Sequence, residues 1–163
     1  MKGGNEMTYI ETLGSNAVKV KKILAVADTG KKNSALAEIS RALIENSDKI
    51  IEANQKDLTA AKENGMSVSM QDRLMLNEDR IKGIASAVDE LIKLEDPIGK
   101  VDNGFVRPNG MRITKIRVPM GVIGMIYESR PNVTADAATL CLKTGNAVIL
   151  RGGKEAYNYN KCI

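Results

Sequence analysis

The stretch GVIGMIYESRPNVTADAATLCLKTGNAVILRGG, residues 121–153, decides the fold. Val122–Ile126 is a short continuous apolar run, and residues 146–150 form a second one. Residues 132–143, which lie between these runs, have the composition of a helix that stops at Gly145. Two apolar strands joined by a helix within about 30 residues are typical of a crossover between parallel strands.

The crossover helix has polar residues at both ends. Asn132 or Thr134 is predicted near its N-cap. Asp136 is predicted in its first turn and Lys143 in its last turn, where each charge suits the helix dipole. Tyr127–Pro131, which precedes the helix, is predicted to be a polar loop.

The first hundred residues are predicted to be mainly helical. Their apolar residues recur at intervals of three and four, which places them on one face of each helix. A polar loop is predicted before the last of these helices. The predicted helices cover residues 8–27, a segment that begins near Asn33 or Ser34 and reaches Ile44, a segment that begins at Ser47 with Asp48 and stops at Asn64-Gly65, and a segment that begins at Asn77 and ends before Pro97.

The pattern then changes to an extended one. Asn103-Gly104 and Pro108–Gly110 are turn signals. Phe105–Arg107 and Met111–Val118 lie between and after these turns, and they indicate a β-ribbon. Because Pro119 cannot donate to a strand ladder, this ribbon is predicted to be an edge or a crossing between sheets.

Together these elements predict an α/β protein with N-terminal helices, a β-ribbon and the first strand–helix–strand unit of a parallel sheet. One such unit does not complete a sheet, because a doubly wound domain needs several more strands to cover both faces. We therefore expect an incomplete domain, and a chain that is the N-terminal part of a longer protein.

The composition narrows the function classes. The 163 residues include 43% hydrophobic and 27% charged residues, a balance typical of globular proteins. No apolar run approaches the roughly 18 residues of a membrane span, and the N-terminus lacks a signal-peptide pattern, so a cytoplasmic protein without a membrane partner is expected. The net charge of +4 comes from scattered basic residues with few aromatic ones, which disfavours nucleic-acid binding.

The sequence contains no histidine. This excludes Ser-His-Asp and Cys-His catalysis and removes the usual zinc ligand. Cys141 lies among apolar helix residues and is predicted to be a buried, inert thiol, whereas Cys162 is predicted to be incidental. Two cysteines at this spacing predict neither a disulfide framework nor a metal site. Any chemistry must rest on lysine, arginine, carboxylates, backbone amides or a bound cofactor.

Two loops follow the two predicted strands and are expected at the same edge of the sheet, where ligands bind in parallel sheets. In the second loop, Gly152 and Gly153 permit close backbone approach, while Arg151 and Lys154 offer positive charge to a phosphate. The segment lacks the spacing of a P-loop or of a dinucleotide fingerprint. Spacing alone leaves open whether this loop is a phosphate cradle or an ordinary strand-to-helix turn.

The first loop, YESRPN, is open to two interpretations as well. In one, Glu128 and Arg130 belong to a solvated turn. In the other, Arg130 faces an anionic group of a substrate, and Asn132 donates its amide to a developing oxyanion.

Three longer stretches carry a resemblance to a known family. They are VPMGVIGMIYESRPNVTADAATLCLKTGNAVILRGGKEA at residues 118–156, ANQKDLTAAKENGMSVSMQDRLMLNEDRI at residues 53–81 and VRPNGMRITKIRVP at residues 106–119. They resemble the N-terminal part of γ-glutamyl phosphate reductase, also called glutamate-5-semialdehyde dehydrogenase, of the aldehyde dehydrogenase superfamily. The resemblance extends from about residue 14 to near the end, where YNYNKC departs from the family pattern at Tyr157 and Tyr159.

The resemblance implies three parts. Residues 1–100 would be the helical part of the cofactor domain, residues 101–119 a ribbon of the oligomerisation type, and residues 120–163 the first βαβ unit of a Rossmann-like NADP-binding domain. The implied reaction is the NADPH-dependent reduction of L-glutamyl 5-phosphate to L-glutamate 5-semialdehyde, with release of phosphate, in proline biosynthesis. The nucleophilic cysteine and its catalytic domain would lie outside this chain, so the chain alone is expected to be inactive.

The resemblance also assigns site residues. Arg151 matches the superfamily's ribose-binding lysine, and the glycines after it would leave room for the 2′-phosphate of NADPH beside Arg151 or Lys154. Asn132 would be the oxyanion donor, with Arg130 as the alternative occupant and as a contact for the substrate. The full-length enzyme would be a homo-oligomer. Two rival functions remain: a non-catalytic module that pairs with full-length reductase subunits, and an independent nucleotide binder.

Overall fold

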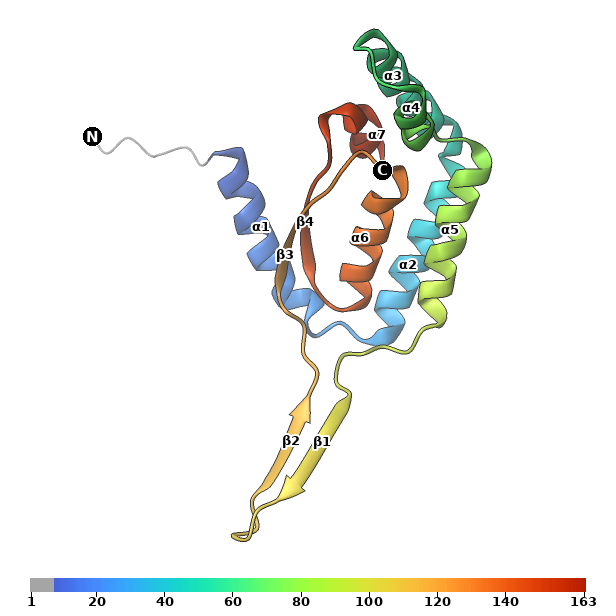
Figure 1. The fold of residues 1–163 in the computed structure, drawn as a ribbon. Helices are drawn as coiled ribbons and strands as arrows, with labels where there is room; N and C mark the ends of the chain where they lie inside the picture. Colours follow the sequence, from blue (N-terminus) through green and yellow to red (C-terminus); the bar gives the residue numbers. More distant parts are fainter. Residues whose placement is uncertain (1–7) are drawn as a thin grey trace, which may run out of the picture.

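The computed structural model describes residues 8–163, and the first seven residues of the predicted segment 1–100 lie outside this range. Helices and strands follow the predicted order of helices, ribbon and crossover (Figure 1). The elements are α1 (Tyr9–Leu24), α2 (Thr29–Glu45), α3 (Ser47–Glu63), α4 (Val68–Leu74), α5 (Glu78–Lys93), β1 (Val101–Val106), β2 (Arg112–Ile116), β3 (Val122–Ile126), α6 (Pro131–Lys143), β4 (Ala147–Arg151), a 3₁₀ turn at Lys154–Ala156, and α7 (Tyr157–Cys162).

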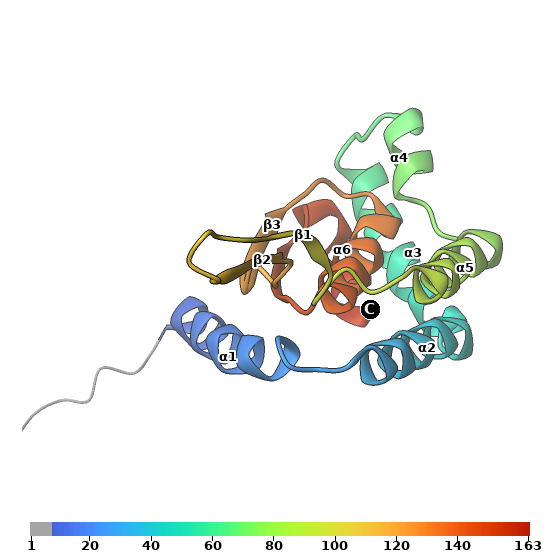
Figure 2. The same cartoon turned by 90° about the horizontal axis from the view of Figure 1, so that it is seen from below.

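The predicted crossover is confirmed. Strands β3 and β4 pair in parallel, with Val122 opposite Ala147 and Ile126 opposite Arg151. Helix α6 covers one face of this pair and α1 covers the other, while α2 and α5 pack outside α6 (Figure 1). Viewed from below, α1 and α2 follow one another along one side of the molecule (Figure 2). The two-stranded sheet thus lies between helical layers, as expected for an incomplete α/β domain.

Helices α1 and α5 form where the sequence predicts them. Thr8 and Glu11 make a capping box at the start of α1, and the hydrogen bonds from the Thr8 backbone and side chain hold the pKa of the Glu11 carboxyl below its ordinary value. In α5 the Asn77 side chain accepts from the backbone N–H of Arg80 at 2.8 Å. The buried face of α5 consists of Ile81, Ile84, Ala85, Val88 and Leu91.

Three helix starts differ from the prediction. Helix α2 begins at Thr29 rather than after Asn33, because the Asp28 carboxylate accepts from the Lys31 backbone N–H at 2.8 Å and caps the helix earlier. The cap of α3 is Asn46, without a side-chain hydrogen bond.

Helix α6 begins with Pro131 at its first position, after Arg130 as the cap. Asn132 is therefore the second residue of the helix and lies near the cap, as predicted, whereas Thr134 is the fourth and Asp136 lies beyond the first turn.

The predicted polar loop before α5 is wrong, because it contains the helix α4. Ser67 caps this helix, and Leu74 at its end is buried. The side chain of Asn54 fixes the chain there: its amide donates to the Leu74 carbonyl at 2.8 Å, and its oxygen accepts from the Leu76 N–H at 2.7 Å. A fully buried asparagine with both functions satisfied thus docks α4 onto α3.

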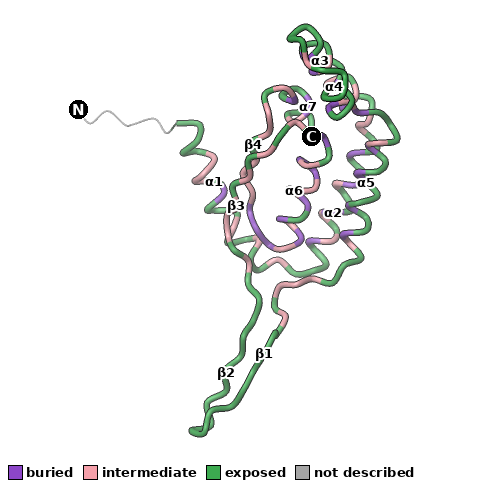
Figure 3. The backbone as a smooth tube through the Cα atoms, viewed as in Figure 1, coloured by how far each residue is buried: buried purple, intermediate pink, exposed green. Residues whose placement is uncertain are grey.

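The β-ribbon is confirmed, with one correction. Strands β1 and β2 pair antiparallel, and Asn103-Gly104 lies within β1, at an irregularity of the register, rather than in a turn. The turn is at Asn109-Gly110, where Gly110 has a φ of 82°. Every residue of both strands is exposed, and the ribbon projects from the body of the molecule (Figures 1 and 3). Among the described helices, none has both the length and the apolar character needed to cross a bilayer.

The C-terminal residues pack tightly onto the body. Tyr159 is fully buried, burial raises its pKa, and its hydroxyl donates to the Pro131 carbonyl. The buried carboxylate of Asp57 accepts from the backbone N–H groups of Asn158 and Tyr159, at 3.0 and 2.8 Å. Tyr159, an outlier from the family pattern, is therefore a core residue, whereas Tyr157 is exposed.

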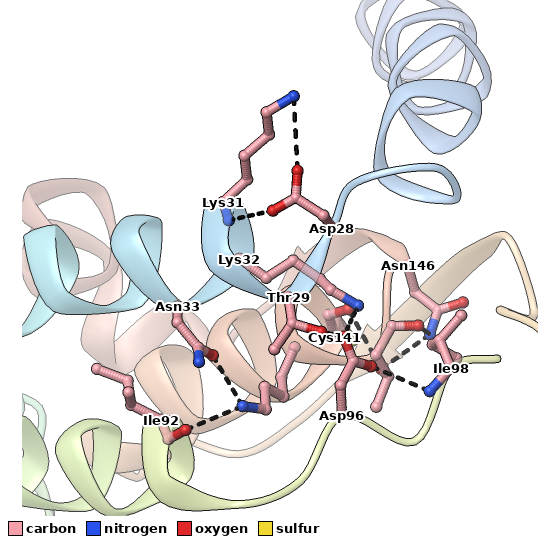
Figure 4. Close-up of polar contacts among 12 residues, drawn as sticks. Asp28, Thr29, Lys31, Lys32, Asn33, Ile92, Asp96, Ile98, Cys141 and Asn146 are labelled. Carbon is pink, nitrogen blue, oxygen red and sulfur yellow. Dashed lines mark hydrogen bonds and ion pairs between the residues drawn. The ribbon is translucent and has the colours of Figure 1, made fainter. Parts of the chain in front are cut away.

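Two buried lysines join the helical layers. Lys32 pairs with Asp96, whose carboxylate also accepts from the Thr29 hydroxyl at 2.9 Å and from the Ile98 N–H at 3.0 Å (Figure 4). Lys143 donates to the Asn33 side chain at 2.8 Å and to the Ile92 carbonyl at 3.1 Å. These contacts connect α2 and α6 to the end of α5.

Removing the Lys32 charge should strongly destabilise the protein. In Lys32→Met, the largely buried Asp96 carboxylate loses its cation, which costs about 3–5 kcal/mol for a buried pair. Chemical denaturation measures the free energy of unfolding. As a matched control, Lys56→Met breaks a surface pair with Glu52 and should leave stability nearly unchanged. Equal effects of the two substitutions would contradict the buried-pair account.

The same pair predicts a loss of stability in acid. Burial raises the pKa of Asp96, but hydrogen bonds from Lys32, the Ile98 N–H and Thr29 outweigh it and hold this pKa below its ordinary value of 3.8. The stabilisation is therefore complete above pH 3.8, the ordinary pKa that Asp96 has in the unfolded chain, and is lost as the pH falls through the lower pKa of the folded state. Denaturation curves between about pH 6 and pH 2 should show a smaller acid loss in Asp96→Asn than in the unsubstituted chain. Superimposable pH profiles would contradict the assignment.

Candidate functional site

The loops after β3 and β4 meet at one edge of the sheet, as the parallel arrangement predicts. The backbone N–H of Tyr127 donates to the Arg151 carbonyl at 3.1 Å and extends the strand pairing into the loops. The Ser129 hydroxyl donates to Glu155 at 2.9 Å. The N–H of Glu155 itself and this hydroxyl hold the pKa of the Glu155 carboxyl below its ordinary value. The two loops thus form one connected surface.

Side chains from other parts of the chain pack closely against Gly152 and Gly153. A Cβ at position 152 would overlap the Asn160 side chain and lie 3.1 Å from the Tyr127 hydroxyl. A Cβ at position 153 would overlap the Ser129 hydroxyl and lie 2.8 Å from the Glu155 carboxylate. The space over both glycines is therefore occupied by side chains of this chain, rather than open.

A hydrogen-bond network sets the position of the first loop. The Tyr127 hydroxyl lies 2.8 Å from Thr134 Oγ1, and Thr134 donates to the Asn160 side-chain oxygen at 2.7 Å. Tyr159 binds the Pro131 carbonyl from the same short helix, α7. Because α7 is itself capped by the buried Asp57, the loop is held from the core of the molecule.

The cationic residues of the second loop are exposed. Arg151 ends β4 and Lys154 begins the 3₁₀ turn, and both are open to solvent. Neither side chain makes a hydrogen bond or an ion pair with the residues in the range 8–163. Their charges remain available to an anion, and these are the residues predicted to hold the 2′-phosphate.

Arg130 and Asn132 lie together in a cavity of about 650 Å³ between α4, α5 and the start of α6. The Asn132 amide donates to Asp136 Oδ2 at 2.8 Å. The charged residues that line this cavity are Asp72, Arg73, Arg80, Arg130 and Asp136. The structure thus groups two sequence-predicted site residues with several charged residues that the sequence analysis did not single out.

A second cavity, of about 490 Å³, shares Arg73 and Arg130 with the first as lining residues. It is lined by residues of both loops, including Ser129, Gly153 and Glu155. Arg73 is the residue that sequence reasoning missed, because the helix that carries it was predicted to be a loop. The serine at position 67, a good cap seven residues before the buried Leu74, was the available signal.

The two cysteines differ in burial. Cys141 is buried in α6, as predicted, and burial raises the pKa of its thiol. Cys162 is exposed near the end of α7. Within residues 8–163, no group of three or more potential acidic or sulfur ligands is arranged to hold a metal ion.

Comparisons with known proteins extend these observations, although no family model matches the chain. γ-Glutamyl phosphate reductase from Clostridium perfringens is 58% identical over 147 residues, which are 90% of this chain and 35% of that protein. The crystal structure of γ-glutamyl phosphate reductase from Thermotoga maritima matches with a TM-score of 0.90 and 43% identity, over 93% of this chain and 36% of that one. The corresponding structure from Saccharomyces cerevisiae matches with a TM-score of 0.88 and 36% identity, over 94% of this chain and 39% of that one.

The chain spans little more than a third of the length of the proteins it matches. The similarity covers the helices, the ribbon and the crossover together, so the resemblance seen in the sequence is confirmed in the fold. In sequence and in structure, this chain therefore matches the N-terminal part of the γ-glutamyl phosphate reductase family.

Proposed function

We propose that this chain supplies the cofactor-binding edge and part of the substrate site for the NADPH-dependent reduction of L-glutamyl 5-phosphate to L-glutamate 5-semialdehyde. The observation that carries the proposal is the meeting of the YESRPN and RGGKEA loops at the carboxyl ends of two parallel strands. This is where α/β proteins bind nucleotides, and the chain around it is similar to γ-glutamyl phosphate reductases. The pathway would be proline biosynthesis, in the cytoplasm.

Arg151 and Lys154 would pair with the 2′-phosphate of NADPH. Both are exposed at the end of β4, and a guanidinium offers two parallel hydrogen bonds to a phosphate. The resemblance implied that Gly152 and Gly153 leave room for the 2′-phosphate. We propose a different role for them: because they lack side chains, Asn160 and Ser129 can close the surface beneath the cofactor. The cofactor, when bound, supplies the hydride.

Arg130 would hold an anionic group of the substrate. It makes no ion pair with any other residue in the described part of the chain, and it lies where the two cavities adjoin. Asn132 remains the proposed oxyanion donor, but its amide donates to Asp136 here, so it must exchange this hydrogen bond before it can serve. A cysteine outside this chain would supply the nucleophile.

The ribbon favours self-association of the complete protein as a homo-oligomer. Its strands expose apolar side chains on a projecting two-stranded sheet that has open edges. The exposed apolar residues are Val101, Phe105, Val106, Ile113 and Ile116. The same feature would let this chain pair with full-length reductase subunits, which is the second candidate function.

Arg151→Ala should weaken binding of NADPH to the 163-residue chain by at least about tenfold, because a charged hydrogen bond to phosphate is lost. Binding of NADH, which lacks the 2′-phosphate, should change little. Fluorescence titration of each nucleotide measures both affinities.

Arg107→Ala is the matched control for this test, since Arg107 is exposed at the ribbon turn, outside both loops. It should leave both affinities unchanged. Equal losses for NADPH and NADH in Arg151→Ala would contradict the assignment of Arg151 to the 2′-phosphate.

The purified chain alone should not oxidise glutamate 5-semialdehyde with NADP⁺ and phosphate, because the Cys141 thiol is buried with a raised pKa and the proposed nucleophilic cysteine lies outside this chain. A chimera should be active if this chain replaces the matching 147-residue segment of the Clostridium perfringens reductase. NADPH formation at 340 nm measures both reactions. Turnover by the isolated chain, or an inactive but folded chimera, would contradict the proposed division of roles.

A further inference from the structure

We propose that the cavity between α4, α5 and the start of α6 binds the amino-acid end of the substrate, with Arg73 on its α-carboxylate and Asp136 on its α-ammonium group. This inference rests on the proposed function, since it takes an amino-acid acyl phosphate as the substrate. It adds two residues that determine specificity, and neither lies in the loops at the sheet edge.

The cavity has the size and the charge pattern of an amino-acid site. Its volume of about 650 Å³ lies within the range of small-molecule pockets. Its twelve lining residues include both guanidinium and carboxylate groups, contributed by three separate segments of the chain, and none of the twelve is aromatic. A mixed set of charges suits a zwitterion, whereas a nucleobase would need a stacking partner and a bare phosphate would need cations alone.

Two of the five charged side chains are already committed within the protein. Arg80 donates to the Met75 carbonyl at 2.6 Å and lies 3.2 Å from Asp72, with which it forms an ion pair. These contacts tie the end of α4 to the first turn of α5. Arg80 and Asp72 therefore shape the wall of the cavity and largely neutralise one another.

The remaining charged groups match the substrate in number and sign. In the described part of the chain, the guanidinium groups of Arg73 and Arg130 make no ion pair or hydrogen bond. Asp136 uses one carboxylate oxygen for the Asn132 amide, and no bond to its other oxygen is present among residues 8–163. Two free cations and one free anion complement a ligand that carries a phosphate, a carboxylate and one ammonium group.

The positions of these groups fix the direction of the ligand. Arg130 belongs to the loop at the sheet edge, so it takes the acyl-phosphate end next to the cofactor loop. Asp136 lies six residues further along α6, which is about 9 Å at 1.5 Å per residue. Asp136 lines the larger of the two cavities and does not line the smaller one. An extended glutamyl phosphate directed along α6 would thus place its amino-acid end between Asp136 and the α4 helix.

The backbone that carries Arg73 is held in place before any ligand binds. The next residue, Leu74, is buried, and the Asn54 side chain bonds both its carbonyl and the N–H of Leu76. Because α4 is fixed to α3 in this way, Arg73 needs only a side-chain rotation to meet a carboxylate. Such preorganisation reduces the entropy cost of binding.

The test removes one charge from the protein and the matching charge from the ligand. L-Glutamate carries both α groups, glutarate lacks the ammonium group, and 4-aminobutyrate lacks the α-carboxylate. Chemical-shift titration of the ¹⁵N-labelled 163-residue chain with each compound gives the three affinities. Arg73→Gln should weaken the binding of L-glutamate and of glutarate by at least about tenfold and leave the affinity for 4-aminobutyrate unchanged. Asp136→Asn should weaken the binding of L-glutamate and of 4-aminobutyrate by a similar factor, and the affinity for glutarate should stay the same or increase.

Matched controls separate charge recognition from a general loss of structure. Arg107→Gln and Asp89→Asn remove one cation and one anion from exposed positions that do not line the cavity, and they should change none of the three affinities. Arg73→Lys keeps the charge and should restore part of the L-glutamate affinity. Thermal unfolding of each variant checks that the fold is intact, as expected for side chains that are not buried.

Two outcomes would overturn the inference. One is an equal loss of affinity for all three compounds in both variants. The other is the failure of the unsubstituted chain to bind any of them at high millimolar concentration. NADPH titration of the same samples keeps the proposed function separate. If Arg73→Gln and Asp136→Asn bind NADPH normally, a negative result concerns this cavity alone.

Discussion

The parallel pairing of β3 with β4 is the constraint on which the rest of the structure depends. Parallel strands require a crossover, and α6 supplies it within the short segment between Ile126 and Ala147. The pairing places the two strand ends side by side, so the loop that starts at Tyr127 and the loop that follows Arg151 lie next to each other. Their contact through Ser129 and Glu155 then gives one surface from two distant segments.

The N-terminal helices pack onto the strand–helix–strand unit and position the loops at its sheet edge, rather than forming a separate domain. Helix α3 provides Asp57, which caps α7, and α7 in turn holds the start of α6 through Tyr159. The same helix α3 provides Asn54, which docks α4 and thereby positions Arg73. Two buried side chains three residues apart on α3 thus fix both walls of the candidate site, although neither touches a ligand position. Buried polar groups with complete hydrogen bonding give this kind of rigidity.

Much of this arrangement could be predicted from the sequence, because the decisive signals are local. The apolar runs fixed the bounds of β3 to the residue and those of β4 to within one, and Asn77 with the apolar stripe after it placed α5. Helix α4 was missed because it is only two turns long and buries only Leu74, so no periodicity could develop. The start of α2 was missed because its first turn contains Gly30, a weak helix former, which is tolerated there because Asp28 caps the helix.

The site was predictable only in part, for a physical reason. The approach of the two loops follows from the topology of parallel strands, which short patterns reveal. Arg73 depends instead on the tertiary docking of α4 against α3, and Asp136 comes to line the same cavity only in the folded chain. Neither placement has a local signature in the sequence. Similarly, the close packing at Gly152 and Gly153 comes from Asn160 and Ser129, which only the folded chain brings there.

The most direct test of the account is to map where adenosine 2′,5′-bisphosphate, the phosphate-bearing half of NADPH, binds to the ¹⁵N-labelled chain. The account predicts that the largest amide shift changes fall on residues 127–130 and 151–155, the two loops at the carboxyl ends of β3 and β4. Shift changes confined to other surfaces, such as α1 or the ribbon, would contradict it, as would the absence of any change at saturating ligand. This measurement tests the sheet edge itself as the nucleotide site.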